Sequence, residues 1–303
     1  MVYYISMKNI VRILLLSPIA LSSVVGCSKK STPIDVVVIS GQSNAVGCTS
    51  IDYIESCPSL GYDAYDEYLA GYEGIRIAYN CWTKDGNLFY PQNKSKGDDF
   101  VKVMLGQGNS LHTFGPEIGI AQSLHEEYDG KLCLIKYACG ASNLKDDWAT
   151  RESPMYGRFI SYVKMQMDNL KSQGYAPTIK AFCWMQGEGD AWDGYYQTYY
   201  ENIKGFVSLV REDLKGLYGE GTLPFIDAGI SDATQWEFYE EVNNAKKQFA
   251  EESEYNFFID TIAEGLHTDQ EPEKNPDTAH YDSESEVLLG KLFAQNFKPF
   301  LAK

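Results

Sequence analysis

The chain has 303 residues, of which 42 are acidic and 26 are basic, so its formal net charge is −16. An acidic excess of this size argues against nucleic-acid binding, because neutralising phosphates requires clustered lysine and arginine. The length is sufficient for one large α/β domain with its own core.

The first 26 residues have the pattern of a secretory signal. A basic start precedes an apolar run that is too short to span a bilayer comfortably, and small residues lead up to Cys27. The segment Val24-Val-Gly-Cys27 resembles a bacterial lipoprotein cleavage box, with valine where leucine is usual. We therefore expect an exported protein, either anchored to a membrane by a lipid on Cys27 or secreted. Residues 27–33 are the expected tether.

Six cysteines remain after Cys27, and none has the spacing of zinc ligands. We expect no metal and no other cofactor. Export permits disulfides. One bridge is plausible among the three cysteines of a loop-rich stretch, whereas the other three lie in apolar runs and are expected to be buried thiols. The first group is Cys48, Cys57 and Cys81, and the second is Cys133, Cys139 and Cys183.

Apolar runs typical of strands alternate with helical patterns along the chain. The expected strands cover residues 34–40, 131–138, 178–185, 223–230 and, more weakly, 255–261. Their continuous hydrophobicity predicts strands that are covered on both faces, as in a parallel sheet. The expected helices cover residues 116–128, 156–173, 195–217, 235–251 and 283–297. This alternation predicts an α/β fold, a three-layer α/β/α sandwich whose mostly parallel sheet has about five strands.

A single domain is expected from residue 34 to residue 303, with an insert at about 48–113. The insert is rich in tyrosine and glycine and has no clear helical period. A long segment of this kind after the first strand either shapes a binding site or covers an edge of the sheet. Both interpretations remain open from the sequence.

Polar, glycine-rich stretches follow three of the apolar strands, at the edge where open parallel sheets bind ligands. They are Gly41-Gln-Ser-Asn44, Ala138-Cys-Gly-Ala-Ser142 and Trp184-Met-Gln-Gly-Glu-Gly-Asp190. A fourth stretch, Asp277-Thr-Ala-His-Tyr-Asp282, precedes the last expected helix. An ordinary turn with Ser43 or Asn44 as a helix cap would explain the first stretch alone. All four together favour a shared site.

These stretches contain the groups that acyl transfer requires. Ser43 supplies a hydroxyl nucleophile, His280 a base, and Asp277 a carboxylate that can fix the imidazole tautomer. Candidate oxyanion donors are the backbone N–H groups of Ser43 and Gly140 and the side-chain amide of Gln186. Asp282 also flanks His280, but we expect it to cap the final helix.

Four motifs resemble the sialate O-acetylesterase-like and acetyl-xylan-esterase-like branch of the SGNH hydrolases. They are GQSN at 41–44, FGPE at 114–117, WxQGE at 184–188 and DxxH at 277–280, and they match in order and spacing. The resemblance runs from about residue 34 to the C-terminal helix and implies the flavodoxin-like SGNH fold.

The resemblance also implies roles for individual residues. Ser43 would be the nucleophile, His280 the base and Asp277 its partner, while Gly140 and Gln186 would complete the oxyanion hole. Many members have a second glycine where this chain has Ala141. Three further residues are expected to support the site, and the glutamate among them is interpreted as a structural hydrogen-bonding group behind it. They are Gln42, Asn44 and Glu188.

The implied activity is removal of acetyl groups from sugar hydroxyls on sialic acids, xylan or related glycans. Trp82, Trp148 and Trp192 are candidate platforms for a sugar, although packing alone would also explain them. The rival hypothesis is a surface glycan-binding lipoprotein on a hydrolase fold with little or no catalysis. The complete set of nucleophile, base, carboxylate and amide argues against that rival. Phosphate binding at the Gly41 turn is excluded because no P-loop lysine follows it.

Overall fold

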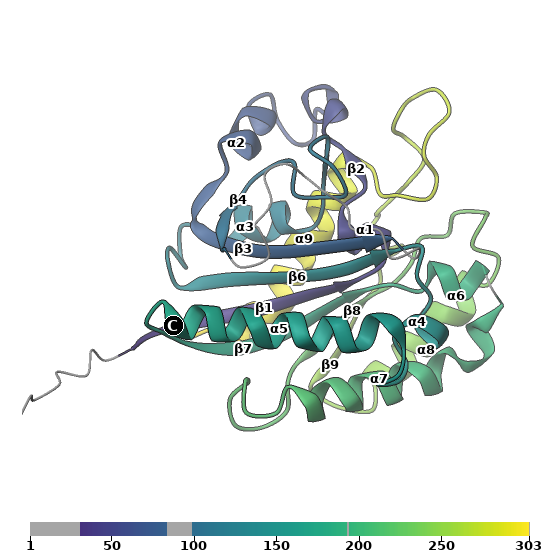
Figure 1. The fold of residues 1–303 in the computed structure, drawn as a ribbon. Helices are drawn as coiled ribbons and strands as arrows, with labels where there is room; N and C mark the ends of the chain where they lie inside the picture. Colours follow the sequence, from purple (N-terminus) through teal and green to yellow (C-terminus); the bar gives the residue numbers. More distant parts are fainter. Residues whose placement is uncertain (1–30, 84–98, 193, 303) are drawn as a thin grey trace, which may run out of the picture. The chain divides into compact units, whose positions relative to one another are not determined.

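A seven-stranded sheet organises the part of the chain that the computed structural model describes, residues 31–83, 99–192 and 194–302. The predicted signal peptide and Cys27 lie outside these residues. The strand order is β4-β3-β6-β1-β7-β8-β9, and only the edge strand β4 is antiparallel to its neighbour (Figure 1). The strands are β1 (Thr32–Gly41), β3 (Tyr72–Thr83), β4 (Val101–Val103), β6 (Leu132–Gly140), β7 (Tyr175–Met185), β8 (Phe225–Ala228) and β9 (Asn256–Ile259).

Helices cover both faces of this sheet. On one face lie α1 (Ser43–Val46), α3 (Glu117–Leu124) and α9 (Ser283–Phe297), and on the other lie α5 (Pro154–Ser172), α7 (Tyr199–Asp213) and α8 (Tyr239–Ala250). The shorter elements are α2 (Ala64–Ala70), α4 (Leu144–Asp147), α6 (Glu188–Trp192), η1 (Ile51–Ser56), η2 (Tyr195–Thr198), η3 (Lys298–Phe300) and the two-strand pair β2 (Thr49–Ser50) and β5 (Thr113–Phe114). The predicted three-layer α/β/α sandwich is therefore confirmed. No described helix is long and apolar enough to cross a membrane.

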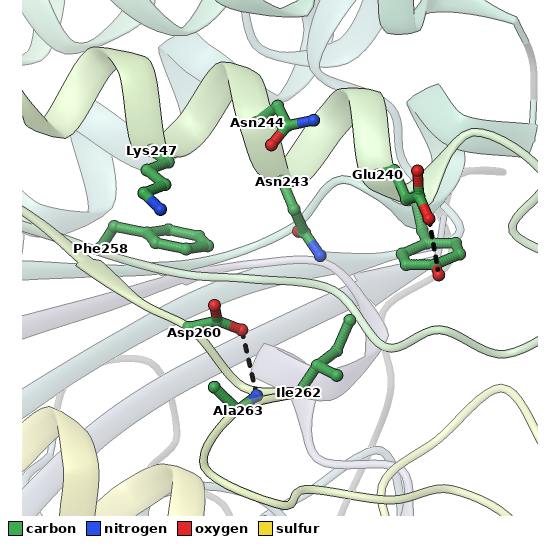
Figure 2. Close-up of a pocket in the computed structure, with 9 residues that line it drawn as sticks. Glu240, Asn243, Asn244, Lys247, Phe258, Asp260, Ile262 and Ala263 are labelled. Atoms are coloured by element: carbon green, nitrogen blue, oxygen red, sulfur yellow. Dashed lines mark hydrogen bonds between the residues drawn. The ribbon is translucent and has the colours of Figure 1, made fainter.

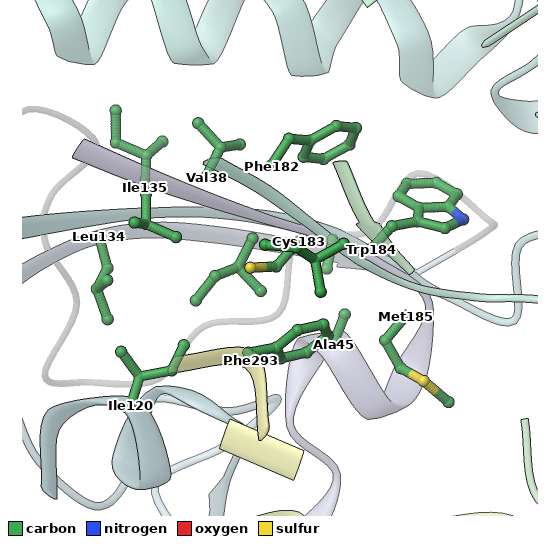
Figure 3. Close-up of a cluster of buried hydrophobic side chains, with 14 of the residues drawn as sticks. Val38, Ala45, Ile120, Leu134, Ile135, Phe182, Cys183, Trp184, Met185 and Phe293 are labelled. Carbon is green, nitrogen blue, oxygen red and sulfur yellow. The ribbon is translucent and has the colours of Figure 1, made fainter. Parts of the chain in front are cut away.

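Neighbouring residues of the central strands point to opposite faces, so both faces of the sheet require an apolar cover. Figure 3 shows Leu134 directed toward Ile120 of α3, while Ile135, next in the chain, points to the opposite face. On that opposite face an aromatic cluster joins β7 to α5 and α7, with Trp184 only 4.7 Å from Phe206 between ring centroids. This double cover is the reason why the strands are continuously hydrophobic in sequence.

The sheet has two more strands than the five predicted, and both come from the segment interpreted as an insert. β3 pairs in parallel with β6 from Ile75 to Thr83, and β4 extends the sheet beyond it. β3 was missed because polar residues interrupt its apolar pattern: Ile75 and Ile77 are fully buried, but Arg76 between them is partly exposed. Alternation of this kind is typical of a strand near the edge of a sheet.

The six described cysteines are all free thiols. The bridge considered among Cys48, Cys57 and Cys81 is therefore not formed. Cys81 is buried within β3, while the other two lie outside the sheet and are half-buried. Cys133, Cys139 and Cys183 are buried, as predicted.

The connections place a crevice at the carboxyl end of β1. The chain builds β3 and β6 on one side of β1 and then crosses to β7, β8 and β9 on the other side. Ligands bind at such a switch point in open α/β sheets. Gly41 ends β1 there with a φ of 141°, and an added Cβ would lie 1.9 Å from the Met185 carbonyl oxygen. Only glycine fits this close approach of two strands, which explains the glycine before the polar turn.

Candidate active site

A cavity of about 320 Å³ lies at the end of β1 and joins all four polar stretches of the sequence. It contains the predicted nucleophile and the predicted base together. Its lining consists of Gln42, Ser43, Ala141, Gly189, Trp192, Trp236, Ala279 and His280. Trp236 was not anticipated, because it follows β8 in a loop that carries no motif.

Ser43 is the first residue of α1 and follows the end of β1 by two positions. The Gln42 N–H donates to the Met185 carbonyl at 2.9 Å, which fixes the turn against β7. The first N–H groups of a helix have no acceptor within the helix. The Ser43 N–H is therefore available as a donor beside its own hydroxyl.

His280 is held by Asp277 at the other side of the cavity. Its Nδ1 donates to Asp277 Oδ2 at 2.7 Å, and Asp277 Oδ1 accepts the Ala279 N–H at 3.0 Å. A carboxylate can only accept, so the neutral ring carries its proton on Nδ1, and Nε2 is its basic nitrogen. Among the hydrogen bonds of the described residues none joins Ser43 to His280, and such contacts commonly tighten only when substrate binds.

The surroundings of His280 shift its pKa upward. Burial by itself would lower the pKa, but hydrogen bonds with the Asp277 carboxylate and the Cys48 thiol favour the charged ring and raise the pKa to about 10. The same hydrogen bond with His280 is the main cause that lowers the pKa of Asp277. Cys48 also lines a second cavity of about 190 Å³, to which Asp277 and His280 contribute. The imidazole thus lies between the Ser43 cavity and a thiol.

A buried hydrogen-bond relay connects three of the motifs. Asn44 Nδ2 donates to Glu188 Oε1 at 2.8 Å, which fixes the amide so that Asn44 Oδ1 accepts the Tyr281 N–H at 3.2 Å. Tyr281 directly follows His280 in the chain. Burial raises the pKa of Glu188. Glu188 is thus a buried residue behind the cavity that accepts a hydrogen bond from Asn44, next to Ser43.

Gln186 does not reach the cavity in this structure. Its Nε2 donates to Asp190 Oδ2 at 2.6 Å and to Gln42 Oε1 at 3.2 Å, and the side chain is fully buried. Gln42 Oε1 also accepts the N–H groups of Gly187 and Gly189 at 3.3 and 3.2 Å. Gln42 thus lines the cavity and also forms hydrogen bonds with the WxQGE segment.

Gly140 likewise lies at the buried end of β6 and is not part of the cavity lining. Its neighbour Ala141 does line the cavity and has a φ of 57°. The left-handed region is strained for alanine and free for glycine, so this backbone would suit the second glycine that the family resemblance implies here. Of the predicted oxyanion donors, only Ser43 is in the cavity lining.

A buried lysine anchors the helix that begins with Ser43. Lys136 Nζ donates to Glu117 Oε2 at 2.7 Å and to the carbonyl oxygens of Val46 and Gln107 at 2.9 Å each. Both charged side chains are fully buried. Val46 is the last residue of α1. Glu117, the glutamate of FGPE, pairs with the lysine that binds this carbonyl, so the buried ion pair anchors the helix that begins with Ser43. One charged residue inside the apolar run of β6 was the sequence signal that could have revealed this pair.

Asp282 does not cap α9 as expected. It occupies the N-cap position without a side-chain cap bond. Instead its Oδ2 accepts from His267 Nδ1 at 2.6 Å and from the Gln270 N–H at 3.0 Å, and its Oδ1 accepts the Glu271 N–H at 2.9 Å. His267, Asp269 and Asp282 form a group with metal-ligand spacing, but these bonds already occupy the Asp282 carboxylate.

The tryptophans proposed as sugar platforms have different environments. Trp148 is fully buried in the aromatic cluster, so packing explains it and it is not a platform. Trp82 is half-buried under Arg158 and does not line the Ser43 cavity. Trp192 lines the cavity and is 65% exposed.

Another cavity, of about 370 Å³, lies between α8 and the end of β9 and shares no lining residue with the Ser43 cavity. Figure 2 shows Asn243 and Lys247 of α8 on one side and Phe258 and Asp260 on the other. Its lining contains no serine, cysteine or histidine. It therefore offers no nucleophile–imidazole pair.

Residues 33–299 match the family described as carbohydrate esterase, sialic acid-specific acetylesterase. A solved structure from Arabidopsis thaliana superposes with a TM-score of 0.60 at 21% identity, covering 89% of this chain and 100% of that one. NanS gives 0.58 at 14% identity, with 89% and 98% covered. A carbohydrate acetylesterase from Xanthomonas citri gives 0.51 at 14% identity, with 88% of this chain and 56% of that one.

These structural likenesses confirm the fold. The comparison with curated protein sequences gave no match. The family match covers nearly all of the described residues, including the four polar stretches that the cavity joins. The chain therefore belongs to the sialic acid-specific acetylesterase family of carbohydrate esterases and is an esterase with a three-layer α/β/α fold.

Proposed function

We propose that this esterase removes acetyl groups from sugar hydroxyls by a Ser-His-Asp mechanism. The observation that carries the proposal is the shared cavity of Ser43 and His280, with His280 fixed by Asp277 at 2.7 Å. The substrate class is an O-acetylated glycan. Sialic acids, xylan and related glycans remain its candidate sources, and the family description names the first of these.

In this mechanism the Ser43 hydroxyl attacks the acetyl carbonyl while His280 Nε2 accepts its proton. The Ser43 N–H stabilises the oxyanion that develops. His280 then returns the proton to the departing sugar oxygen, which leaves an acetyl-serine. A water deprotonated by the same imidazole then attacks the acetyl-serine, and acetate is released as the proton returns to Ser43 Oγ. Asp277 stabilises the imidazolium during both acylation and deacylation.

The decisive experiment measures acetate release from a panel of acetylated glycans by the wild type, Ser43→Ala and Ser59→Ala. Ser43→Ala should lose several orders of magnitude in turnover, because triad members act as a unit. Ser59→Ala is the matched control, since it removes an exposed serine hydroxyl that does not line the cavity. A Ser43→Ala enzyme that keeps more than about a tenth of the wild-type rate would contradict the assignment. Glycan binding by the wild type without acetate release would favour the rival binding protein.

We also propose that the protein is exported and held at a membrane by a lipid on Cys27. The pattern of residues 1–26 and the cleavage box before Cys27 support this. Metabolic labelling with a fatty-acid analogue should mark the wild type and not Cys27→Ala. Equal labelling of both would contradict the proposal.

A further inference from the structure

Two tryptophans from different elements meet in the wall of the Ser43 cavity. Trp192 ends α6, and Trp236 lies in the loop between β8 and α8. Their rings pack edge to face, with centroids 6.3 Å apart and planes at 78°. Trp192 is the most exposed tryptophan of the described residues, at 65%.

Leaving an indole exposed forgoes the favourable free energy of burying a large apolar surface. A single exposed aromatic on an open surface is ordinary. This one lies in the cavity that contains the nucleophile and the base. Its exposure therefore has an explanation in ligand binding that a remote residue such as Tyr62, 97% exposed, does not have.

Residues next to each tryptophan are hydrogen-bonded to other segments of the site. The α6 segment before Trp192 is held because Asp190 Oδ2 accepts the Leu144 N–H at 2.7 Å and Gln42 Oε1 accepts the Gly189 N–H at 3.2 Å. Beside Trp236, Gln235 Oε1 accepts from the Thr278 hydroxyl at 3.0 Å.

Gln42 directly precedes the nucleophile, and Thr278 lies between Asp277 and His280. The indoles are thus tied to the two ends of the catalytic apparatus. A platform attached in this way holds its ligand at a fixed position relative to Ser43.

The chemistry of this wall fits a sugar ring. A pyranose presents a face of C–H groups, which packs on an indole through dispersion and the hydrophobic effect. We propose that Trp192, braced by Trp236, is the binding platform for the pyranose ring that carries the acetyl ester. The inference rests on the proposed function and adds a residue that selects sugar esters from other acetyl esters.

The test compares kcat and KM for a sugar acetate and for ethyl acetate, which has no ring. Trp192→Ala should raise KM for acetylated xylobiose or O-acetylated sialic acid roughly tenfold. The kcat/KM for the sugar ester should therefore fall at least about fivefold further than the kcat/KM for ethyl acetate, which offers the indole no ring. Trp192→Phe, which keeps a ring, should recover part of the affinity. The two sugar substrates identify which pyranose the platform accepts.

Tyr62→Ala is the matched control, because it removes an exposed aromatic that does not line the cavity. Equal losses on the sugar ester and on ethyl acetate, or no change on either, would overturn the platform. If the wild type hydrolyses no ester, the proposed mechanism fails by itself. Calorimetric titration of glycan into Ser43→Ala and into Ser43→Ala/Trp192→Ala then decides the platform separately, because undiminished binding by the double variant contradicts it.

Discussion

At the scale of single residues, His280 acquires its properties from neighbours on two sides. Asp277 accepts from Nδ1, and Cys48 contacts the ring from the second cavity. Both neighbours favour the protonated ring, whereas a general base must be neutral before it can accept the nucleophile's proton. The residues that orient the base therefore also determine the pH range in which it works.

The rate of deacetylation should rise with pH above the ordinary histidine pKa of about 6.5, because the pKa of His280 is raised to about 10. Asp277→Asn and Cys48→Ala each remove a group that raises this pKa, so each should move the rising limb toward lower pH. The corresponding stabilisation of the fold is present below about pH 6.5 and is lost as pH rises through the folded-state pKa. Profiles of kcat/KM against pH for the wild type and the two variants test this. A rising part of the profile at the same pH in both variants as in the wild type would contradict it.

Asp277 and Asp282 flank His280 but have different partners, and paired substitutions should separate their roles. Asp277→Asn should lower turnover by roughly two to four orders of magnitude with little change in KM, because the amide supports the wrong tautomer. Asp282→Asn should cost little turnover but about 1–3 kcal/mol of stability, because its buried carboxylate accepts from His267 and two backbone N–H groups. Turnover and melting temperature are measured for both, and the opposite pattern would reverse the assignment.

At the scale of elements, α1 is too short to be stable alone and depends on its anchors. Four residues form a single turn, whose isolated formation is unfavourable. Lys136 holds its last carbonyl, at Val46, and the bond from Asn44 to Glu188 holds its first turn. Ser43, the proposed nucleophile, is therefore positioned by contacts from β6 and α6 rather than by the helix that contains it.

Lys136→Met should destabilise the protein by about 3–5 kcal/mol, because it leaves the Glu117 carboxylate buried without its charged partner. Lys136→Met combined with Glu117→Gln should recover much of that loss. Chemical unfolding measures the free energies, and Lys171→Met is the control because its ion pair with Asp168 is exposed and worth less than about 1 kcal/mol. If Lys136→Met is no less stable than Lys171→Met, the buried pair does not stabilise the protein as expected.

At the scale of the whole molecule, the fold buries an acidic side chain that makes no hydrogen bond among the described residues. Glu286 of α9 is fully buried, and within the described part of the chain neither carboxylate oxygen has a hydrogen-bond partner. Burial raises its pKa well above the ordinary value. The folded protein therefore retains a proton there that the unfolded chain has released, so global stability falls as pH rises above about 4.5.

Glu286→Gln should remove this pH dependence because the amide does not ionise. The variant should match the wild type near pH 4 and exceed it increasingly at higher pH, by on the order of 1 kcal/mol for each pH unit until the glutamate ionises in the folded state. Urea unfolding at pH 5, 6.5 and 8 measures the difference. A difference that stays constant over this range would show that Glu286 does not hold its proton.

Local patterns in the sequence were enough to predict the layers and the region of the site. Continuously apolar strands require cover on both faces, and parallel strands bring their carboxyl ends to one edge. The turn at Ser43 and the segment with His280 could thus be assigned to one cavity although 237 positions separate Asn44 from Tyr281, which share a hydrogen bond. The catalytic roles of these residues remain predictions.

Only the tertiary structure decided features that depend on neighbours distant in sequence. The apolar pattern of β3 is interrupted, and the segment is a strand because it pairs with β6. Gln186 is enclosed by Asp190 and Gln42, and Trp236 enters the cavity from a loop without a motif. Periodicity and spacing in the sequence indicate which face of an element is buried. Whether one amide is buried or one indole is exposed depends on how different elements pack together, and a local pattern cannot predict that.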